Sequence, residues 1–244
     1  MCVNISVVIP AFNEEKFLPA TLQSLQAAAS KAWNSLPWEW EIIVCNNNSS
    51  DRTAEVAQAA GAKVVFEPVN QISRARNTGA RAASGQWLMF MDADSHPSAA
   101  LLADAAQAMK SEDVAGGGAV LKFDNSAPWG HWAVHFWNFC SRTLRWAAGS
   151  FLFCRSQAFS ELGGFDETLF VSEEIDFSRR LKRWARKHQQ RVIILNRNPL
   201  VTSGRKTHLY TLGDHLKFIA RSLYMGRRLC RTRQHCGIWY EGRR

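Results

Sequence analysis

Hydrophobic positions in the first 110 residues follow two alternating spacings. Short apolar runs, rich in β-branched and aromatic side chains and typical of buried strands, lie at 5–12, 40–47, 63–68 and 86–94. Segments between and after them have apolar residues every three or four positions, which predicts helices over 14–33, 49–62, 73–84 and 97–111. Repeated strand–helix units favour an α/β fold, with a mostly parallel central sheet and helices on both faces.

The second half of the chain is less regular. Its apolar runs predict a strand at 116–124, a strand and a helix over 149–165, a helix over 172–188 and a strand at 191–195. A further helix is predicted around 212–229. We therefore expect one α/β domain over residues 1–205, followed by a basic helical extension over residues 206–244.

Aromatic and basic side chains are interspersed between residues 128 and 146, where the pattern assigns neither a helix nor a strand. They are Trp129, His131, Trp132, His135, Trp137, Arg142, Arg145 and Trp146. Three interpretations are open for this segment: core packing, a platform on which a sugar or lipid acceptor stacks, and an interfacial helix that lies on a membrane.

The net charge of +9 is unevenly distributed along the chain. Residues 1–178 contain 12 basic and 19 acidic side chains, whereas residues 179–244 contain 18 basic and 2 acidic ones. This asymmetry indicates either an anionic partner of the C-terminal part, such as phosphate or an anionic membrane, or a solvated basic face. No recognition motif for nucleic acid accompanies the charge, so nucleic acid is not an expected partner.

Cysteine spacing and hydropathy indicate where the protein resides. The six cysteines show no CxxC spacing, which predicts reduced thiols without zinc or disulfides. The N-terminal apolar run has no basic region ahead of it, and no run approaches the ~20 apolar residues of a membrane-spanning helix. We expect a cytoplasmic protein whose contact with the inner membrane surface, if it makes one, is peripheral.

Two carboxylates, Asp92 and Asp94, come at the end of the fourth predicted strand. On an extended segment, side chains two positions apart point to the same face, so these carboxylates can share one hard cation, Mg²⁺ or Mn²⁺. The alternative is a helix-capping aspartate next to an exposed loop aspartate. We expect the loops after Ile9, Val44 and Met91 at one edge of the sheet, where ligands of such folds bind.

Five segments resemble, in family order, the motifs of the family 2 glycosyltransferases, which have the Rossmann-like GT-A fold. They are VVIPAFNEEKFL (7–18), EIIVCNNNSSDRTAEVA (41–57), SRARNTGARAASGQWLMFMDADSHP (73–97), GSFLFCRSQAFSELGGFDE (149–167) and SEEIDFSRRLKR (172–183). The resemblance covers roughly residues 4–205. It implies a nucleotide-binding half over 1–110, an acceptor half over 111–205, and metal-dependent sugar transfer from a UDP- or GDP-sugar to a carbohydrate or lipid-linked acceptor.

The resemblance also implies roles for individual residues. Those matched to the donor nucleotide are Pro10, Ala11, Asn13, Glu14, Asn46, Arg76, Asp92 and Ala93. Asp94 and His208 are matched to the metal, Mn²⁺ or Mg²⁺, which would neutralise charge on the departing diphosphate. Asn46 departs from the pattern, because the family usually has an aspartate there that contacts the base. Arg205 and Lys206 are further candidates for contacting the diphosphate.

The acidic segment at 173–176 resembles the family's EDxD motif, whose second acid is the general base of inverting transferases. Glu174 stands at that position, a departure by one methylene, and is predicted to be catalytic together with Asp92. The residues expected on the acceptor side are Gly149, Ser150, Glu173 and Glu174. The alternative is that these acids only stabilise the first turn of a helix. We expect the two aspartates, Asn46 and Glu174 to converge in one pocket.

A binding protein is the second hypothesis. It would be either a GT-A domain that has lost catalysis, or a membrane-surface or nucleic-acid-binding module. The departures at Asn46 and Glu174 favour the first form, and the basic C-terminal part favours the second.

Overall fold

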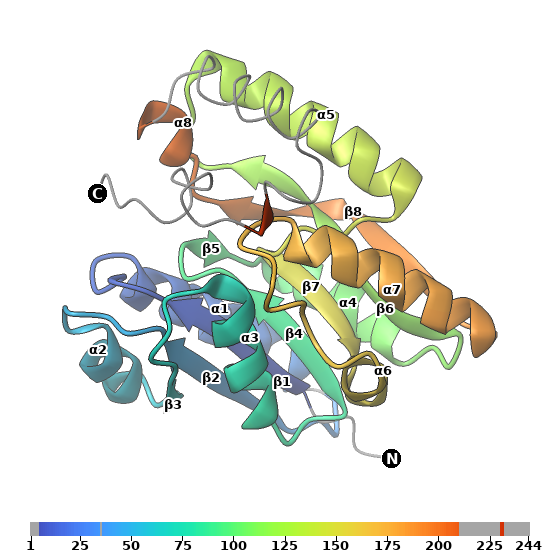
Figure 1. Cartoon of the computed structure of the whole chain (residues 1–244), viewed down its shortest axis with the longest axis horizontal. Coiled ribbons are helices and arrows are strands. Elements are labelled where there is room, and N and C mark those ends of the chain that lie inside the picture. Colours follow the sequence, from blue (N-terminus) through green and yellow to red (C-terminus); the bar gives the residue numbers. More distant parts are fainter. Residues whose placement is uncertain (1–4, 35, 210–229, 232–244) are drawn as a thin grey trace.

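The computed structural model describes residues 5–34, 36–209 and 230–231. Within these residues the strands form an eight-stranded sheet in the order β3-β2-β1-β4-β7-β6-β8-β5 (Figure 1). The strands are β1 (Ile5–Ala11), β2 (Trp40–Asn46), β3 (Lys63–Phe66), β4 (Trp87–Met91), β5 (Ser95–His96), β6 (Val114–Phe123), β7 (Phe151–Arg155) and β8 (Arg191–Thr202). The helices are α1 (Leu18–Trp33), α2 (Thr53–Ala59), α3 (Ile72–Arg81), α4 (Ala99–Met109), α5 (Pro128–Leu144), α6 (Ser156–Glu161), α7 (Glu173–Lys187) and α8 (Lys206–Leu209).

Most neighbouring strands run parallel, which confirms the predicted sheet. The parallel pairs are β3–β2, β2–β1, β1–β4 and β6–β8. Strand β7 lies between β4 and β6 and runs antiparallel to both, and the short β5 runs antiparallel to β8. The strands of the two predicted halves therefore meet in one continuous sheet, at the β4–β7 pair and again at the β8–β5 pair.

Helices cover both faces of the sheet, as predicted (Figure 1). Successive side chains of a strand point to opposite faces. On β1, Val7 and Ile9 belong to a core that includes α1, α2 and α4, whereas Val8 belongs to a second core with α6 and α7. Burial on both sides explains why the central strands read as continuous apolar runs.

Helix α3 packs closely on the second face of β1. A Cβ atom added at Gly79 would lie 2.4 Å from Cγ1 of Val8, so a larger residue cannot fit without displacing the helix or the strand. This close approach fixes the preceding turn of α3, which carries the buried side chain of Arg76.

Three segments of the second half differ from, or extend, the sequence-based expectation. Most of residues 128–146 form helix α5. The strand predicted at 191–195 continues to Thr202, because β8 pairs with β6 along its length and with β5 at its end. The helix predicted around 212–229 lies outside the described residues, which include only α8 and residues 230–231 of the 206–244 extension. The proposed boundary at residue 205 stays a prediction.

Membrane-spanning helices and disulfide bonds can be checked within the described residues. None of the helices there is both long and apolar enough to cross a membrane. Cys45, Cys140, Cys154 and Cys230 form no disulfide.

Candidate active site

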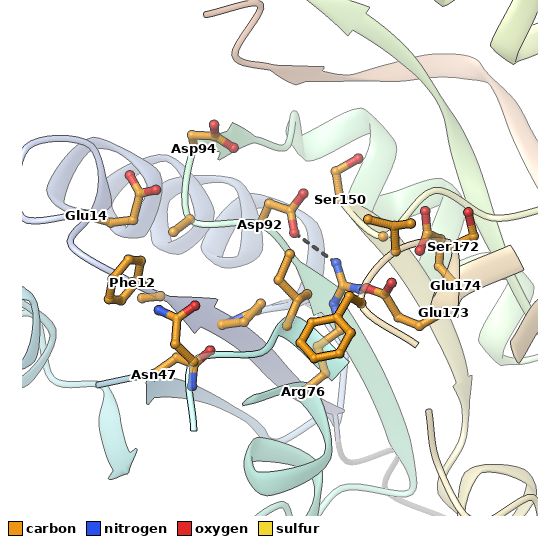
Figure 2. Close-up of a pocket in the computed structure, with 18 of the residues that line it drawn as sticks. Phe12, Glu14, Asn47, Arg76, Asp92, Asp94, Ser150, Ser172, Glu173 and Glu174 are labelled. Atoms are coloured by element: carbon orange, nitrogen blue, oxygen red, sulfur yellow. Dashed lines mark hydrogen bonds and ion pairs between the residues drawn. The ribbon is translucent and has the colours of Figure 1, made fainter. Parts of the chain in front are cut away.

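A cavity of about 390 Å³ lies at the edge of the sheet where β1, β2 and β4 end. Because these strands are parallel, the loops that follow them share one edge, as expected. The start of α7 and the turn before β7 close the cavity on its other side (Figure 2). The first half of the chain therefore supplies one wall and the second half supplies the opposite wall.

Most of the predicted site residues line this cavity. They are Pro10, Ala11, Glu14, Arg76, Asp92, Ala93, Asp94, Gly149, Ser150, Glu173 and Glu174. The two aspartates and Glu174 thus converge as expected.

Asn13, Asn46 and His208 are not among the residues that line the cavity. The side-chain oxygens of Asn13 and Asn46 accept backbone N–H bonds from Ser50 and Ser49, at 2.8 and 2.9 Å. Both amides therefore shape the loop at the sheet edge. His208 is exposed on α8, and its proposed role as a metal ligand finds no support in this position.

Other residues of the lining were not predicted as site residues. They are Phe12, Asn47, Asn70, Ile72, Trp137, Phe170, Val171, Ser172 and Ile175, whereas Arg205, a further candidate from the sequence, does line the cavity. Asn47, and not the predicted Asn46, lines the cavity. Its side-chain amide donates hydrogen bonds to the carbonyls of Glu67 and Val69, and its side-chain oxygen accepts one from the backbone N–H of Gln71. Asn47 therefore orders the loop along the rim. The apolar residues carried no sequence signal, since isolated Phe, Ile and Val look like core residues.

Arg76 joins the two walls of the cavity. Its side chain is 4% exposed, and its guanidinium donates to Oε1 of Glu173 at 2.7 Å and to Oδ1 of Asp92 at 3.1 Å. It also lies 5.5 Å from the ring centroid of Phe165. Burial alone would lower the pKa of Arg76, but the neighbouring carboxylates raise it overall, so the side chain stays charged.

Glu173 is buried beside Glu174 at the start of α7. Burial raises the pKa of Glu173, the charge of Glu174 raises it further, and the guanidinium of Arg76 opposes both. The pKa lies above the usual value overall, so Glu173 holds a proton more readily than an exposed glutamate does. The first turn of α7 therefore contains an acid held in the wall and a second acid, Glu174, that is half-buried and lines the cavity.

Arg205 connects the end of the β8 segment to the first loop. Its guanidinium binds both carboxylate oxygens of Glu14, at 2.7 and 3.2 Å, and lies 3.2 Å from Oδ2 of Asp94. It also lies 4.5 Å from the ring centroid of Phe17. Burial lowers the pKa of Arg205, but the hydrogen bond to Glu14 and the charge of Asp94 raise it overall.

Asp92 and Asp94 therefore each have a guanidinium partner, Arg76 and Arg205. The chain turns at Ala93 and Asp94 after β4 ends at Met91, so the argument from an extended segment does not apply. Two arginines offset the repulsion that two unpaired carboxylates would suffer at the end of a buried strand.

The donor set fits a hard divalent cation, since the carboxylates at the cavity offer only oxygen ligands. Among the described residues, however, no three His, Cys, Asp or Glu side chains form a metal site by themselves. A cation held at Asp94 would complete its shell with oxygens of a ligand or water.

Unsatisfied donors also line the cavity. In the described part of the chain, Asn70 Nδ2, Arg76 Nε and Trp137 Nε1 are buried without a hydrogen-bond partner, and all three residues belong to the lining. Leaving a buried N–H group unpaired costs about 1–3 kcal/mol. A ligand rich in acceptor oxygens, such as a phosphate or a sugar, would satisfy such groups.

Known proteins resemble this chain in sequence. The family model described as Glycosyl transferase family 2 matches residues 6–159. The uncharacterized glycosyltransferase EpsJ of Bacillus subtilis is 30% identical over 102 residues, which are 40% of this chain and 28% of EpsJ. The 4,4'-diaponeurosporenoate glycosyltransferase of Staphylococcus haemolyticus is 40% identical over 98 residues, 37% of this chain and 24% of that protein. The match thus spans less than a third of either relative.

Solved structures share the fold at low sequence identity. TarS of S. aureus in complex with UDP-GlcNAc gives a TM-score of 0.65 at 18% identity, covering 98% of this chain and 71% of the TarS chain. The mannosyltransferase PcManGT of Pyrobaculum calidifontis in complex with GDP-Man and Mn²⁺ gives a TM-score of 0.64 at 17% identity. That match covers 94% of this chain and 64% of the PcManGT chain. The predicted α/β architecture is the one these enzymes have.

Proposed function

Because the chain belongs to glycosyl transferase family 2, we propose that it transfers a sugar from a UDP- or GDP-sugar to a hydroxyl group of a carbohydrate or lipid-linked acceptor. One observation supports this most directly: Asp92 and Asp94 of the first half share a cavity with Glu173 and Glu174 of the second half. The structures of PcManGT with GDP-Man and Mn²⁺ and of TarS with UDP-GlcNAc add support, since the fold is shared.

The donor binds, in this proposal, along the loops that follow β1 and β4. Pro10, Ala11 and Ala93 contact the nucleoside, and Asp92 faces the ribose. Asp94 holds Mn²⁺ or Mg²⁺, which when bound neutralises charge on the departing diphosphate. Arg205, already beside Asp94, adds a second positive charge at that end of the cavity.

Glu174 acts as the general base on the acceptor side. Its carboxylate takes the proton of the acceptor hydroxyl while the hydroxyl oxygen bonds to the anomeric carbon, and the bond from that carbon to the diphosphate oxygen breaks. Attack from the face opposite the leaving diphosphate inverts the configuration. Gly149 and Ser150 border the acceptor, and Arg76 positions Asp92 and Glu173 relative to each other.

Replacing Gly149 with alanine is expected to lower kcat/KM by roughly tenfold or more, because a misplaced positioning group costs that much in near-attack geometry. A Cβ atom there would lie 2.3 Å from Nη2 of Arg76, a buried group already held by two carboxylates. Steady-state kinetics on purified variants would measure the loss.

Gly61→Ala is the matched control for that variant. Gly61 has φ +78 with nothing within 4 Å of the added Cβ, so alanine there should cost about 1 kcal/mol of stability without changing the kinetics. Wild-type kinetics for Gly149→Ala would show that the position of Arg76 does not matter for transfer.

Two other functions compete with transfer. A GT-A domain without catalysis is favoured by Asn46, whose amide is engaged in the loop, and a nucleic-acid-binding module by the basic residues 179–244. A cytoplasmic location and peripheral contact with an anionic membrane belong to the main proposal.

A thermal-shift screen tests the proposal against these alternatives. UDP, GDP and their sugar conjugates would be added with Mn²⁺, beside a single-stranded oligonucleotide at physiological salt. A donor present at about 100 times its Kd should raise the melting temperature by roughly 5 °C or more, since ligands that bind only the native state stabilise it. Stabilisation by the oligonucleotide but by no nucleotide would refute the enzyme.

A further inference from the structure

Helix α5 exposes a row of large aromatic side chains. Trp132 is 80% exposed, Phe136 71% and Phe139 60%. Positions spaced by three and four residues lie on one face of a helix, so these three rings form one continuous stripe. Single exposed apolar residues are ordinary, whereas a contiguous stripe of the largest ones marks an interaction surface. The three residues are called the aromatic stripe below.

The stripe is exposed although α5 is firmly attached to the fold. Asn138 donates to the carbonyl of Leu121 on β6 and accepts its N–H, at 2.8 and 2.9 Å. At the C-terminal end of the helix, Nζ of Lys182 donates to the carbonyl of Leu144 at 2.7 Å. Figure 1 shows the helix along the outside of the molecule, above β6 and β8. The fold thus holds the aromatic stripe toward solvent.

The same helix reaches the active-site cavity. Trp137, one position after Phe136, lines the cavity, and its indole N–H is buried without a hydrogen-bond partner. Because successive helical residues point about 100° apart, one helix can present an outer surface and a cavity wall at once. A molecule bound at the stripe therefore lies one helix diameter, roughly 10 Å, from the cavity.

Positive charge gathers at the C-terminal end of α5, where Lys182 binds the carbonyl of Leu144. Burial lowers the pKa of Lys182 on α7, and the neighbouring cations lower it further; they are Arg186, Arg145 and Arg179. Arg142 on α5 is exposed as well. Residues 125–160 contain no aspartate or glutamate, so no carboxylate on α5 offsets these charges.

We propose that the aromatic stripe of α5 docks on the surface of an anionic lipid bilayer, with the cluster of Arg145, Arg179, Lys182 and Arg186 against its headgroups. Trp and Phe rings favour the interface between headgroups and acyl chains, and each nearby Lys or Arg adds attraction to anionic lipid. The role of this contact rests on the proposed function: it brings the acceptor hydroxyl of a lipid-linked substrate to the cavity wall formed by Trp137.

Vesicle co-sedimentation tests the docking surface. The full chain would be mixed with vesicles of phosphatidylcholine alone and of phosphatidylcholine with phosphatidylglycerol. Binding is expected to the anionic vesicles, and the triple variant Trp132→Ser, Phe136→Ser, Phe139→Ser should reduce the partition coefficient by on the order of tenfold or more. The single variant Phe136→Ser should lower it by a smaller factor, which guards against misfolding of the triple variant.

Phe66→Ser is the matched control. Phe66 is 57% exposed on β3, at the opposite edge of the sheet, so its loss should leave vesicle binding unchanged. Equal vesicle binding by the wild type and the two stripe variants would overturn the proposal and assign the contact to other basic segments. A concentration-dependent dimer that the stripe variants dissociate would overturn it as well, because the occupant would then be a second copy.

Failure of this proposal is separable from failure of the proposed function. Nucleotide binding in solution needs no membrane, so the stripe variants should keep the thermal shift given by nucleotide and Mn²⁺. Vesicle binding without any nucleotide binding would refute the enzyme and leave the docking surface standing.

Discussion

Replacing Asp94 with asparagine is expected to lower sugar transfer by about 100-fold or more, because a metal-binding carboxylate acts where charge develops on the leaving group. The amide keeps the size of the side chain, and Arg205 retains its two contacts to Glu14. The variant should therefore stay folded. Release of nucleoside diphosphate from a nucleotide sugar in Mn²⁺ measures the loss, and circular dichroism checks the fold.

Asp104→Asn serves as the matched control for this carboxylate. Asp104 lies on α4, outside the cavity lining, and its Oδ2 accepts a hydrogen bond from Nδ2 of Asn198 at 2.9 Å. This variant should release nucleoside diphosphate from the nucleotide sugar at the wild-type rate. If Asp94→Asn transferred sugar in Mn²⁺ at the wild-type rate, Asp94 would not be a metal ligand, and its role would be structural, as in its ion pair with Arg205.

Glu174→Gln should lower kcat by about 100- to 10,000-fold, the usual contribution of a general base, with nucleotide affinity nearly unchanged. The amide cannot accept the acceptor proton, but it keeps the shape of the cavity wall. Steady-state rates, combined with a titration of nucleoside diphosphate, separate the two effects. If Glu174 only supports the first turn of α7, the variant would lose no more than about 1 kcal/mol of stability and would keep its rate.

Asp176 provides the comparison within the same helical turn. It forms an ion pair with Arg180 at 2.7 Å and does not belong to the cavity lining. Asp176→Asn should therefore reduce stability slightly while transfer continues. Equal losses of rate in the two variants would indicate a structural effect of the acidic segment rather than general-base catalysis by Glu174.

Local patterns predicted the first half of the fold well, because each of its central strands is buried on both faces and each helix has an apolar stripe. The place of β7 was not predictable in this way. Its run of Phe151 to Arg155 has the same local signature as a parallel strand, and only its pairing with Leu88 and Met89 in β4 sets its direction. Helix α5 was expected in only one of the three interpretations of its segment, because its exposed face carries large aromatic side chains as a buried face does.

For the site, the sequence predicted which residues take part but not how they pair with one another. Motifs identified the aspartates, Glu174 and Arg76 as site residues, and Arg205 was a further candidate. The ion pairs that the two arginines form with these carboxylates were not predicted, because they join segments far apart in the chain. Arg205 reaches Glu14 across 191 positions. The prediction at Asn46 was off by one residue, and Asn47 lines the cavity instead. Asn46 is the last residue of β2 that pairs with β1, and Asn47 is the first residue beyond that pairing. Where a strand ends is set by tertiary pairing, so this shift could not be read from the sequence.

The dependence of nucleotide binding on metal tests the central claim most directly. Calorimetric titration of the full chain with UDP and with GDP, each in Mn²⁺ and in a chelator, would measure it. At least one nucleotide should bind about tenfold more tightly with Mn²⁺, because the cation and the diphosphate complete each other's ligand shells at Asp94. Equal affinity with Mn²⁺ and with the chelator, or no binding of either nucleotide, would contradict a metal-dependent donor site at this cavity.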